Sequence, residues 1–357
     1  MMGWSQALLV LLALEGKPGF PDLRDGTSCG SAINEPRTIR WGLSTGLAES
    51  ERRARMWGYH DAGVRSYQAE QNRADPRVPV TPMPEDPVGP TVARIYDVLL
   101  GGDDSYQADR RFVRSLEPAD AEALSVAAVI NRLHVPGVVG RLTARGIDQF
   151  LDLGCGLLPW TSSPPDEFEP YANLHDIVAR HQDTARVVYA DHDASIFGTS
   201  RTVVEEHPLR PRWVQGDIRY MREFLTSGRV QYVLDWSRPI GVLLHDVLPW
   251  ISPKETVTEA MGVLRELLPS GSALSITHAT DFGENRMTRF TKKFRRAGID
   301  FTPRDATVIE ALFGDWPLEP PGLVPPHRWR AAHPHAELDP HEAGALAGLA
   351  FKPEQSP

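Results

Sequence analysis

From residue 149 onward, short apolar runs alternate with stretches that have the spacing of amphipathic helices. The apolar runs occupy residues 149–153, 186–190, 212–214, 239–244 and 273–277. The helical stretches between them span residues 173–180, 195–206, 218–226 and 254–267. Strands that alternate with helices predict a parallel sheet covered on both faces. The sequence therefore predicts an α/β fold, with a Rossmann-like doubly wound domain over residues 149–330.

The rest of the chain is predicted to form three further parts. Residues 1–88 mix short polar stretches with Pro, Gly and Arg, which is typical of a disordered or weakly structured extension. Alternatively, translation starts downstream, at Met56 or Met83, and part of this segment is never made. Residues 89–148 have apolar positions at helical spacing and predict a helical preface, or cap. Residues 331–357, rich in Pro, His, Ala and Glu, predict a mobile tail.

Charge and cysteine content narrow the environment of the protein and its partners. The formal net charge of −9 disfavours nucleic acid as a partner, because phosphate backbones require a basic face. The apolar run over residues 7–14 is shorter than the roughly 20 residues of a membrane span, and no basic residue precedes it, so we expect neither membrane insertion nor secretion. Cys29 and Cys155 lie far apart and predict no disulfide framework, which favours a cytoplasmic protein.

The first predicted strand runs into a glycine turn. Asp152 lies near the end of this strand, and Gly154, Cys155 and Gly156 follow it. Glycines at this position let the backbone turn sharply and let a ligand approach without meeting a Cβ atom. A plain turn between a strand and a helix is the alternative, because such a glycine pair is a weak signal alone.

Acidic residues follow the next two predicted strands. Asp191, His192 and Asp193 follow the second strand, and Asp217 and Ile218 follow the third. In a doubly wound fold, a carboxylate at the end of the second strand binds the ribose diol of a nucleotide. We expect Asp191 to be this group, with Asp193 as the second candidate. Asp217 could accept a hydrogen bond from an adenine amino group or could be the N-cap of the next helix.

The glycine pattern distinguishes between a dinucleotide and S-adenosylmethionine as the cofactor of such a site. A dinucleotide requires the phosphate cradle Gly-x-Gly-x-x-Gly, and Pro159 stands where its last glycine should be. S-adenosylmethionine has no phosphate, and its ribose, adenine, amino acid and sulfonium groups suit carboxylates and aromatic rings. The sequence therefore favours S-adenosylmethionine over a nicotinamide or flavin cofactor.

Several short segments occur along the chain as a set of ordered motifs. They are residues 93–102 (ARIYDVLLGG), Asp109-Arg110, Asn131-Arg132, residues 150–157 (FLDLGCGL), 173–175 (NLH), 188–193 (VYADHD), 277–280 (THAT) and 321–325 (PGLVP). In this order they resemble a family of S-adenosylmethionine-dependent methyltransferases from Streptomyces and related actinobacteria, long known as a domain of unknown function. The resemblance implies a class I methyltransferase sheet with a helical N-terminal preface.

The resemblance also implies roles for individual residues. Tyr96, Gly101 and Gly102 would close over the cofactor from the preface. The remaining pocket residues implied by the family are Gly154, Gly156, Asp191 and Asp217. The chain departs from the family pattern by an insertion before residue 173, and by Leu248-Pro249 where the family has Leu-His.

Three polar residues at the ends of the fourth and fifth predicted strands are candidate catalytic groups. His245, Asp246 and His278 would lie at the sheet edge where a methyl acceptor enters, and a histidine has a pKa suited to proton transfer near neutral pH. Histidines that only satisfy a turn are the alternative. No metal is required for methyl transfer, and the histidines after residue 326 lack a ligand spacing that would predict a metal site.

Together these features predict a methyltransferase that acts on a small molecule, and the family context suggests secondary metabolism. A non-catalytic S-adenosylmethionine-binding regulator or scaffold is the alternative, and a nicotinamide-dependent oxidoreductase is a third hypothesis. The sequence contains no signal for an oligomeric state.

Overall fold

The structure is a computed structural model that describes residues 89–159, 172–205, 207–281, 285–330, 333 and 336–354. All of these belong to one compact unit, Ser50–Pro357. The predicted extension over residues 1–88, with its alternative starts, lies outside the described residues, and so does most of the insertion before residue 173.

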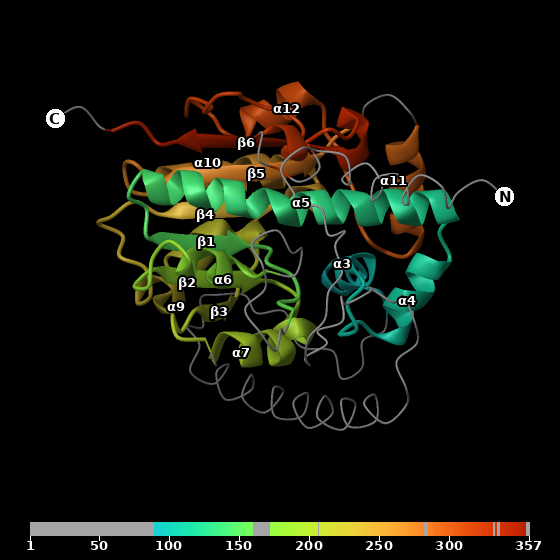
Figure 1. The fold of residues 1–357 in the computed structure, drawn as a ribbon, viewed down its shortest axis with the longest axis horizontal. Coiled ribbons are helices and arrows are strands. Elements are labelled where there is room, and N and C mark those ends of the chain that lie inside the picture. Colours follow the sequence, from blue (N-terminus) through green and yellow to red (C-terminus); the bar gives the residue numbers. More distant parts are fainter. Residues whose placement is uncertain are drawn as a thin grey trace, which may run out of the picture. The chain divides into compact units, whose positions relative to one another are not determined.

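The described residues form a six-stranded sheet in the order β3-β2-β1-β4-β5-β6 (Figure 1). The strands are β1 Gln149–Leu153, β2 Arg186–Asp191, β3 Arg212–Gln215, β4 Gly241–His245, β5 Ala273–Ala279 and β6 Ala345–Phe351. The first five are parallel, and β6 pairs antiparallel with β5. The chain reverses its direction across the sheet between β1 and β4, and ligands of doubly wound folds bind at this switch point. The predicted α/β class is confirmed.

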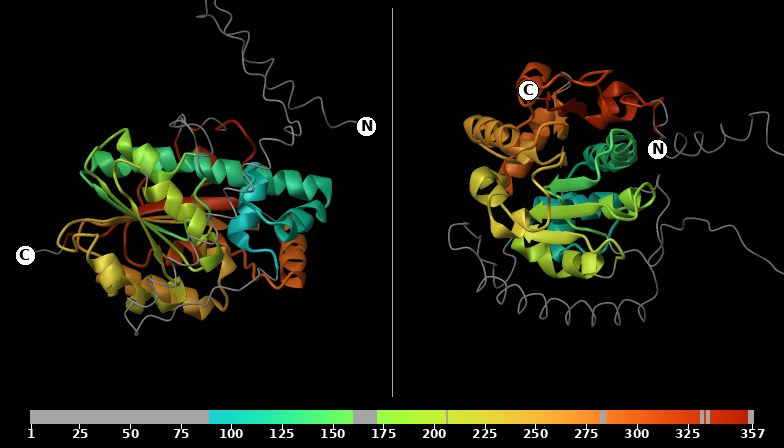
Figure 2. Two further views of the ribbon diagram at one scale, coloured as in Figure 1. Left: turned by 90° about the horizontal axis from the view of Figure 1, so that it is seen from below. Right: turned by 90° about the vertical axis from the view of Figure 1, so that its left-hand side faces the viewer.

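Helices cover both faces of the sheet, as Figure 2 shows for the green α5 on one side and the orange α10 on the other. One buried cluster joins the sheet to α5 (Pro118–Ala144), α6 (Leu174–Ala179) and α7 (Phe197–Glu205). A second cluster joins the other face to α8 (Met221–Leu225), α9 (Gly228–Gln231), α10 (Lys254–Leu267) and the segment after α12 (Ala306–Ala311). The central strands are buried on both faces, which explains why they read as continuous apolar runs in the sequence.

The carboxyl-terminal segment corrects one prediction. Residues 345–351, expected to belong to a mobile tail, form β6 and pair with all seven residues of β5. The physical reason is the pairing with β5, which satisfies the backbone of both strands and buries five of the seven residues. His333, within the predicted tail, and His327, just before it, are buried as well.

Among the described residues, three helices precede the sheet and enclose a third apolar cluster. They are α3 (Val92–Leu100), α4 (Gln107–Arg114) and α5, and α11 (Arg286–Arg296) packs with them. Helix α3 ends at Gly101, which has a φ of 83° and needs the conformational freedom of glycine. Helix α5 is long and apolar enough to cross a membrane by length and composition, but a core helix meets the same test, and its second half is buried against the sheet.

Candidate functional site

A cavity of about 500 Å³ lies at the carboxyl ends of β1, β2 and β4 and is also lined by residues of α3 and α5. Figure 1 shows the position of these helices and strands. Its volume is within the range of small-molecule sites. Most of the predicted cofactor-binding residues line it, together with two of the three predicted catalytic residues. They are Tyr96, Asp152, Gly154, Cys155, Gly156, Asp191, His192, Asp193, His245 and Asp246.

The glycine turn after β1 forms one wall of the cavity. Gly154 has a φ of 76°, and a Cβ atom there would lie 2.2 Å from a methyl group of Val247. The N–H of Gly156 donates a hydrogen bond of 2.9 Å to Asp191 Oδ2, which ties the turn to the end of β2. Between the glycines, burial raises the pKa of the Cys155 thiol well above its usual range, so this residue stays protonated.

The acidic segment after β2 forms the adjoining wall. Burial alone would raise the pKa of Asp191, but hydrogen bonds from His192, from the Asp193 N–H and from the Gly156 N–H bring it below its ordinary value. The hydrogen bond to Asp191 raises the pKa of His192 to about 9. Asp191 therefore stays ionised at neutral pH with both oxygens engaged, whereas Asp193 Oδ2 has no hydrogen-bond partner in the described part of the chain.

Two further carboxyl groups in the cavity have raised pKa values. Burial raises the pKa of Asp152 to about 7. Burial, followed by the charges of Asp104 and Asp103, raises the pKa of Asp97 to about 7 as well. Asp97 lies on α3, and its Oδ2 is buried without a hydrogen-bond partner among the described residues. Both groups would favour a ligand that brings positive charge or hydrogen-bond donors.

A chain of hydrogen bonds from Tyr96 through Asn131 and Thr277 holds the backbone of Asp246 in place. The Tyr96 hydroxyl accepts a bond of 2.8 Å from the Asn131 amide, and Asn131 Oδ1 accepts one of 2.7 Å from the Thr277 hydroxyl. The Thr277 hydroxyl oxygen accepts a bond of 2.8 Å from the Asp246 N–H. Asp246 has a φ of 55°, a conformation that a non-glycine residue adopts only when its surroundings impose it.

Burial changes the acid strengths of His245 and Asp246 in opposite directions. It lowers the pKa of His245 to about 3, and the His245 ring is hydrogen-bonded to Ser275 at 2.8 Å. It raises the pKa of Asp246 to about 7. A proton acceptor works best when its pKa is near the ambient pH, so Asp246 is the better candidate base of the two.

Five predicted site residues do not line the cavity. Asp217 accepts hydrogen bonds from the Arg219 N–H and guanidinium, which matches its alternative reading as an N-cap, and Ile218 begins the short helix that it caps. His278 is fully buried, with Nε2 2.8 Å from Arg304, and burial lowers its pKa to about 3. The other two are Gly101 and Gly102.

The two preface glycines do not line the cavity, but Gly102 affects a residue that does. A Cβ atom on Gly102 would lie 2.0 Å from Asp97 Oδ1, so the glycine leaves room for a carboxyl group that does line the wall. Sequence reasoning missed Asp97, Asn131, Arg132 and Trp250, all of which line the cavity. The first three lie inside the motifs quoted above, so the motif positions themselves were the signal that could have identified them.

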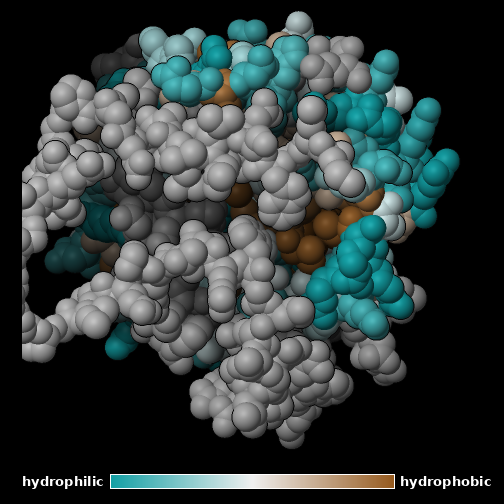
Figure 3. Space-filling view, turned by 45° about the vertical axis from the view of Figure 1, so that its right-hand side comes forward, coloured by the Kyte–Doolittle hydropathy of each residue, from teal (hydrophilic) through white to brown (hydrophobic). Residues whose placement is uncertain are grey.

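A second, apolar recess adjoins the first cavity. Tyr96, Asn131, Asp246 and Trp250 line both. The remaining walls come from α3, α5, α11 and the segments after them, and they include Leu99, Leu124, Met287, Phe290, Phe294 and Phe301. Figure 3 shows hydrophobic surface at the bottom of a hollow between hydrophilic rims on this side of the molecule.

Residues 81–353 match the model of a family described as S-adenosyl methyltransferase. A solved structure from Thermobifida fusca YX, assigned provisionally as a methyltransferase, is 32% identical and has a TM-score of 0.65; the match covers 74% of this chain and 96% of that one. A DUF574 family protein from Streptomyces avermitilis is 27% identical with a TM-score of 0.66, over 74% of this chain and 98% of that one. No match was found among curated proteins.

Proposed function

Since the chain belongs to the S-adenosyl methyltransferase family, whose model it matches over residues 81–353, it is an S-adenosylmethionine-dependent methyltransferase, and we propose that it methylates a small molecule with Asp246 as the general base. The observation that carries this proposal is the position of Asp246. Its side chain lines both the larger cavity and the apolar recess, and its pKa is near 7. We also propose that the enzyme is cytoplasmic, because its two cysteines lie far apart in the sequence and predict no disulfide framework.

The larger cavity fits S-adenosylmethionine by the chemistry of its walls. When bound, the cofactor supplies an electrophilic methyl group on a sulfonium cation. We assign Asp191 and Asp193 to the ribose hydroxyls, because Asp191 is ionised and Asp193 Oδ2, although 3.7 Å from the Arg94 guanidinium, has no hydrogen-bond partner among the described residues. We assign Asp97 and Asp152 to the positively charged end of the cofactor, where ionised carboxylates are favoured. Gly154 in the turn leaves room for the side chain of Val247, which also lines the cavity.

The apolar recess is the proposed acceptor site. Its aromatic and aliphatic walls exclude water, and Asp246 is the carboxyl group at the boundary with the cofactor cavity. An acceptor with an apolar body and one hydroxyl or amine could bury its body in the recess and direct the polar group toward Asp246. Asp246 would then accept the proton that the nucleophile loses as the methyl group is transferred.

Labelled methyl groups test this proposal. Protein incubated with methyl-labelled S-adenosylmethionine and the small-molecule fraction of a cell extract should transfer label to a small molecule. The Asp246→Asn variant should bind S-adenosylhomocysteine in calorimetry as the wild type does, but should lose transfer. Label that appears only in macromolecules would contradict the small-molecule acceptor, and full transfer by Asp246→Asn would remove the base.

The alternative of a non-catalytic regulator makes a different prediction for the same experiment. Such a protein would bind S-adenosylhomocysteine but would transfer no label with any fraction. No feature of the described residues favours this alternative over catalysis.

A further inference from the structure

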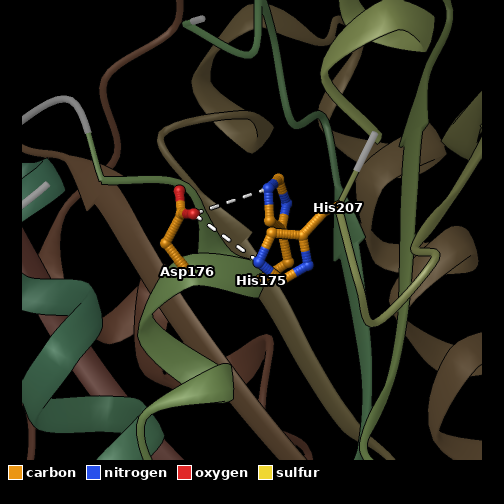
Figure 4. A group of neighbouring side chains, drawn as sticks. All are labelled: His175, Asp176 and His207. Atoms are coloured by element: carbon orange, nitrogen blue, oxygen red, sulfur yellow. Dashed lines mark ion pairs between the residues drawn. The ribbon is translucent and has the colours of Figure 1, made fainter. Parts of the chain in front are cut away.

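Outside the cavities, three side chains converge behind β2: His175 and Asp176 on α6, and His207 after α7 (Figure 4). Asp176 Oδ1 lies 3.8 Å from His175 Nε2 and 3.8 Å from His207 Nε2. All three atoms lie within 4.8 Å of one another. The two distances of 3.8 Å are too long for hydrogen bonds, so the three polar groups lie close together without being hydrogen-bonded to one another at these atoms, and a point between them is left for a ligand.

We propose that this point binds a divalent transition metal of the zinc class, held by His175 Nε2, Asp176 Oδ1 and His207 Nε2. Two imidazoles and one carboxylate form a ligand set that zinc uses, with metal–ligand bonds of about 2.0–2.2 Å. Two ligands of one tetrahedral zinc therefore lie about 3.3 Å apart, so a small inward movement of the side chains would complete the site. Imidazole ligands disfavour Mg²⁺ and Ca²⁺, which prefer oxygen.

Neighbouring groups already orient two of the three ligands. His175 is 2% exposed, and its Nδ1 lies 2.8 Å from the hydroxyl of Tyr189 on β2. With the proton on Nδ1 donated to this hydroxyl, the lone pair of Nε2 faces the metal. Asp176 Oδ2 accepts a hydrogen bond of 3.0 Å from the Asn173 N–H, which turns Oδ1 toward the histidines. Such supporting contacts are typical of protein metal sites.

His207 is the ligand that must move. Its side chain is 18% exposed, and its Nδ1 accepts a hydrogen bond of 3.2 Å from the Leu209 N–H. A metal on Nε2 requires a proton on Nδ1, so the ring must turn away from that N–H when the metal binds. The three protein ligands leave the fourth position to water or a small anion. The metal would tie the segment after α7 to α6, next to the strand that ends at Asp191.

Zinc titration of the full chain, stripped of metal with a chelator, tests the proposal. Calorimetry should give one saturable zinc per chain, and zinc should raise the Tm. His207→Ala and Asp176→Asn should each weaken zinc binding at least tenfold and reduce the Tm shift. His181→Ala is the matched control, because His181 is exposed two residues after the end of α6 and its loss should leave binding unchanged.

Two results would overturn the zinc site. One is the absence of saturable binding to wild-type protein whose circular dichroism shows it to be folded. The other is equal zinc affinity in the wild type and in folded His207→Ala, which would assign the metal to other histidines of the chain. Neither result depends on methyl transfer, so the zinc site can be disproved without affecting the proposed methyl transfer, and the reverse is also true.

Discussion

At the scale of single residues, the environment decides what neighbouring side chains can do. His245 and Asp246 adjoin in the sequence and line the same cavity, yet burial lowers the pKa of one to about 3 and raises that of the other to about 7. Burial disfavours the charged form of each group. A histidine held neutral at pH 7 is a weak base here, whereas the carboxyl group can take up a proton near neutral pH.

The pH dependence of turnover follows from the raised pKa of Asp246. A general base must be deprotonated, so we expect kcat to rise about tenfold per pH unit below pH 7 and to level off above it. Asp246→Asn should lower kcat by about 10²- to 10⁴-fold and abolish this dependence. The measurement is labelled methyl transfer between pH 5 and 9 at saturating cofactor.

His245→Gln is the control for this experiment. An amide can still hydrogen-bond Ser275, so we expect kcat within a few-fold of the wild type and the same pH profile. A loss as large as that of Asp246→Asn would transfer the role of base to His245.

At the scale of elements, contacts between the preface and the sheet decide which motif residues reach the site. Arg94 on α3 is buried, and its Nε donates a hydrogen bond of 2.9 Å to Asp109 on α4. Arg94 also contacts Ser195 and lies 3.7 Å from Asp193 after β2. These two residues of the opening motif therefore hold the preface against the end of β2, a role that the sequence pattern alone could not distinguish from ligand binding.

Gly102, just after the end of α3, is predicted to tolerate no side chain without a loss of stability. A methyl group at this position would lie 2.0 Å from Asp97 Oδ1, so Gly102→Ala must displace that carboxyl group or the turn. We expect a loss of about 1–3 kcal/mol in unfolding free energy and a weaker affinity for S-adenosylhomocysteine, about tenfold. Urea unfolding and calorimetry provide the two measurements.

Gly140→Ala is the matched substitution inside α5. A Cβ atom there meets no other atom within 4 Å, and alanine is favoured over glycine in helices by about 0.5–1 kcal/mol. It should leave cofactor affinity unchanged and stability equal or higher. Equal behaviour of the two alanine variants would show that Asp97 does not need the space at Gly102.

The hydrogen-bond chain behind Asp246 links α3, α5 and β5. Asn131→Ala removes one hydrogen bond from the Thr277 hydroxyl and one from the Tyr96 hydroxyl, so we expect a loss of about 1–3 kcal/mol in unfolding free energy and a lower kcat. Thr143→Ala removes a hydroxyl that bonds only to the backbone of α5 and should change neither. If Asn131→Ala kept wild-type kcat, the chain would not position Asp246.

At the scale of the whole molecule, the parallel part of the sheet was predictable and its edge was not. The five parallel strands are buried on both faces and therefore appear as apolar runs bounded by turns. The run from Ala345 to Phe351 contains small residues and glycine, which have low strand propensity, and follows a His- and Pro-rich segment. Only its pairing with β5 makes it a strand, and a long-range contact of this kind leaves no local signal.

The site shows the same division between local and long-range information. The glycine turn directly follows β1, and the acidic residues Asp191 and Asp193 lie at the end of β2, so both features were predictable from the sequence. Asn131 reaches the cavity from α5 and Trp250 from the short 3-10 helix Leu248–Trp250, and only the packed fold brings these two elements together. His278 lies near the end of β5 and His245 is the last residue of β4, yet the His278 side chain is buried against Arg304. A position near the end of a strand does not reveal in which direction the side chain points.

The last prediction concerns β6 as the cover of the sheet edge. All seven residues of β5 are buried, and β6 pairs with each of them. A chain that ends at Gly344 would expose this apolar strand with its backbone groups unpaired, and such an edge promotes association. We expect the truncated protein to aggregate or to melt at least several degrees lower, whereas a chain that ends at Glu354 keeps the strand and should match the wild type. Size-exclusion chromatography and thermal unfolding decide the matter, and a monomeric truncated protein with wild-type Tm would show that β5 does not depend on β6.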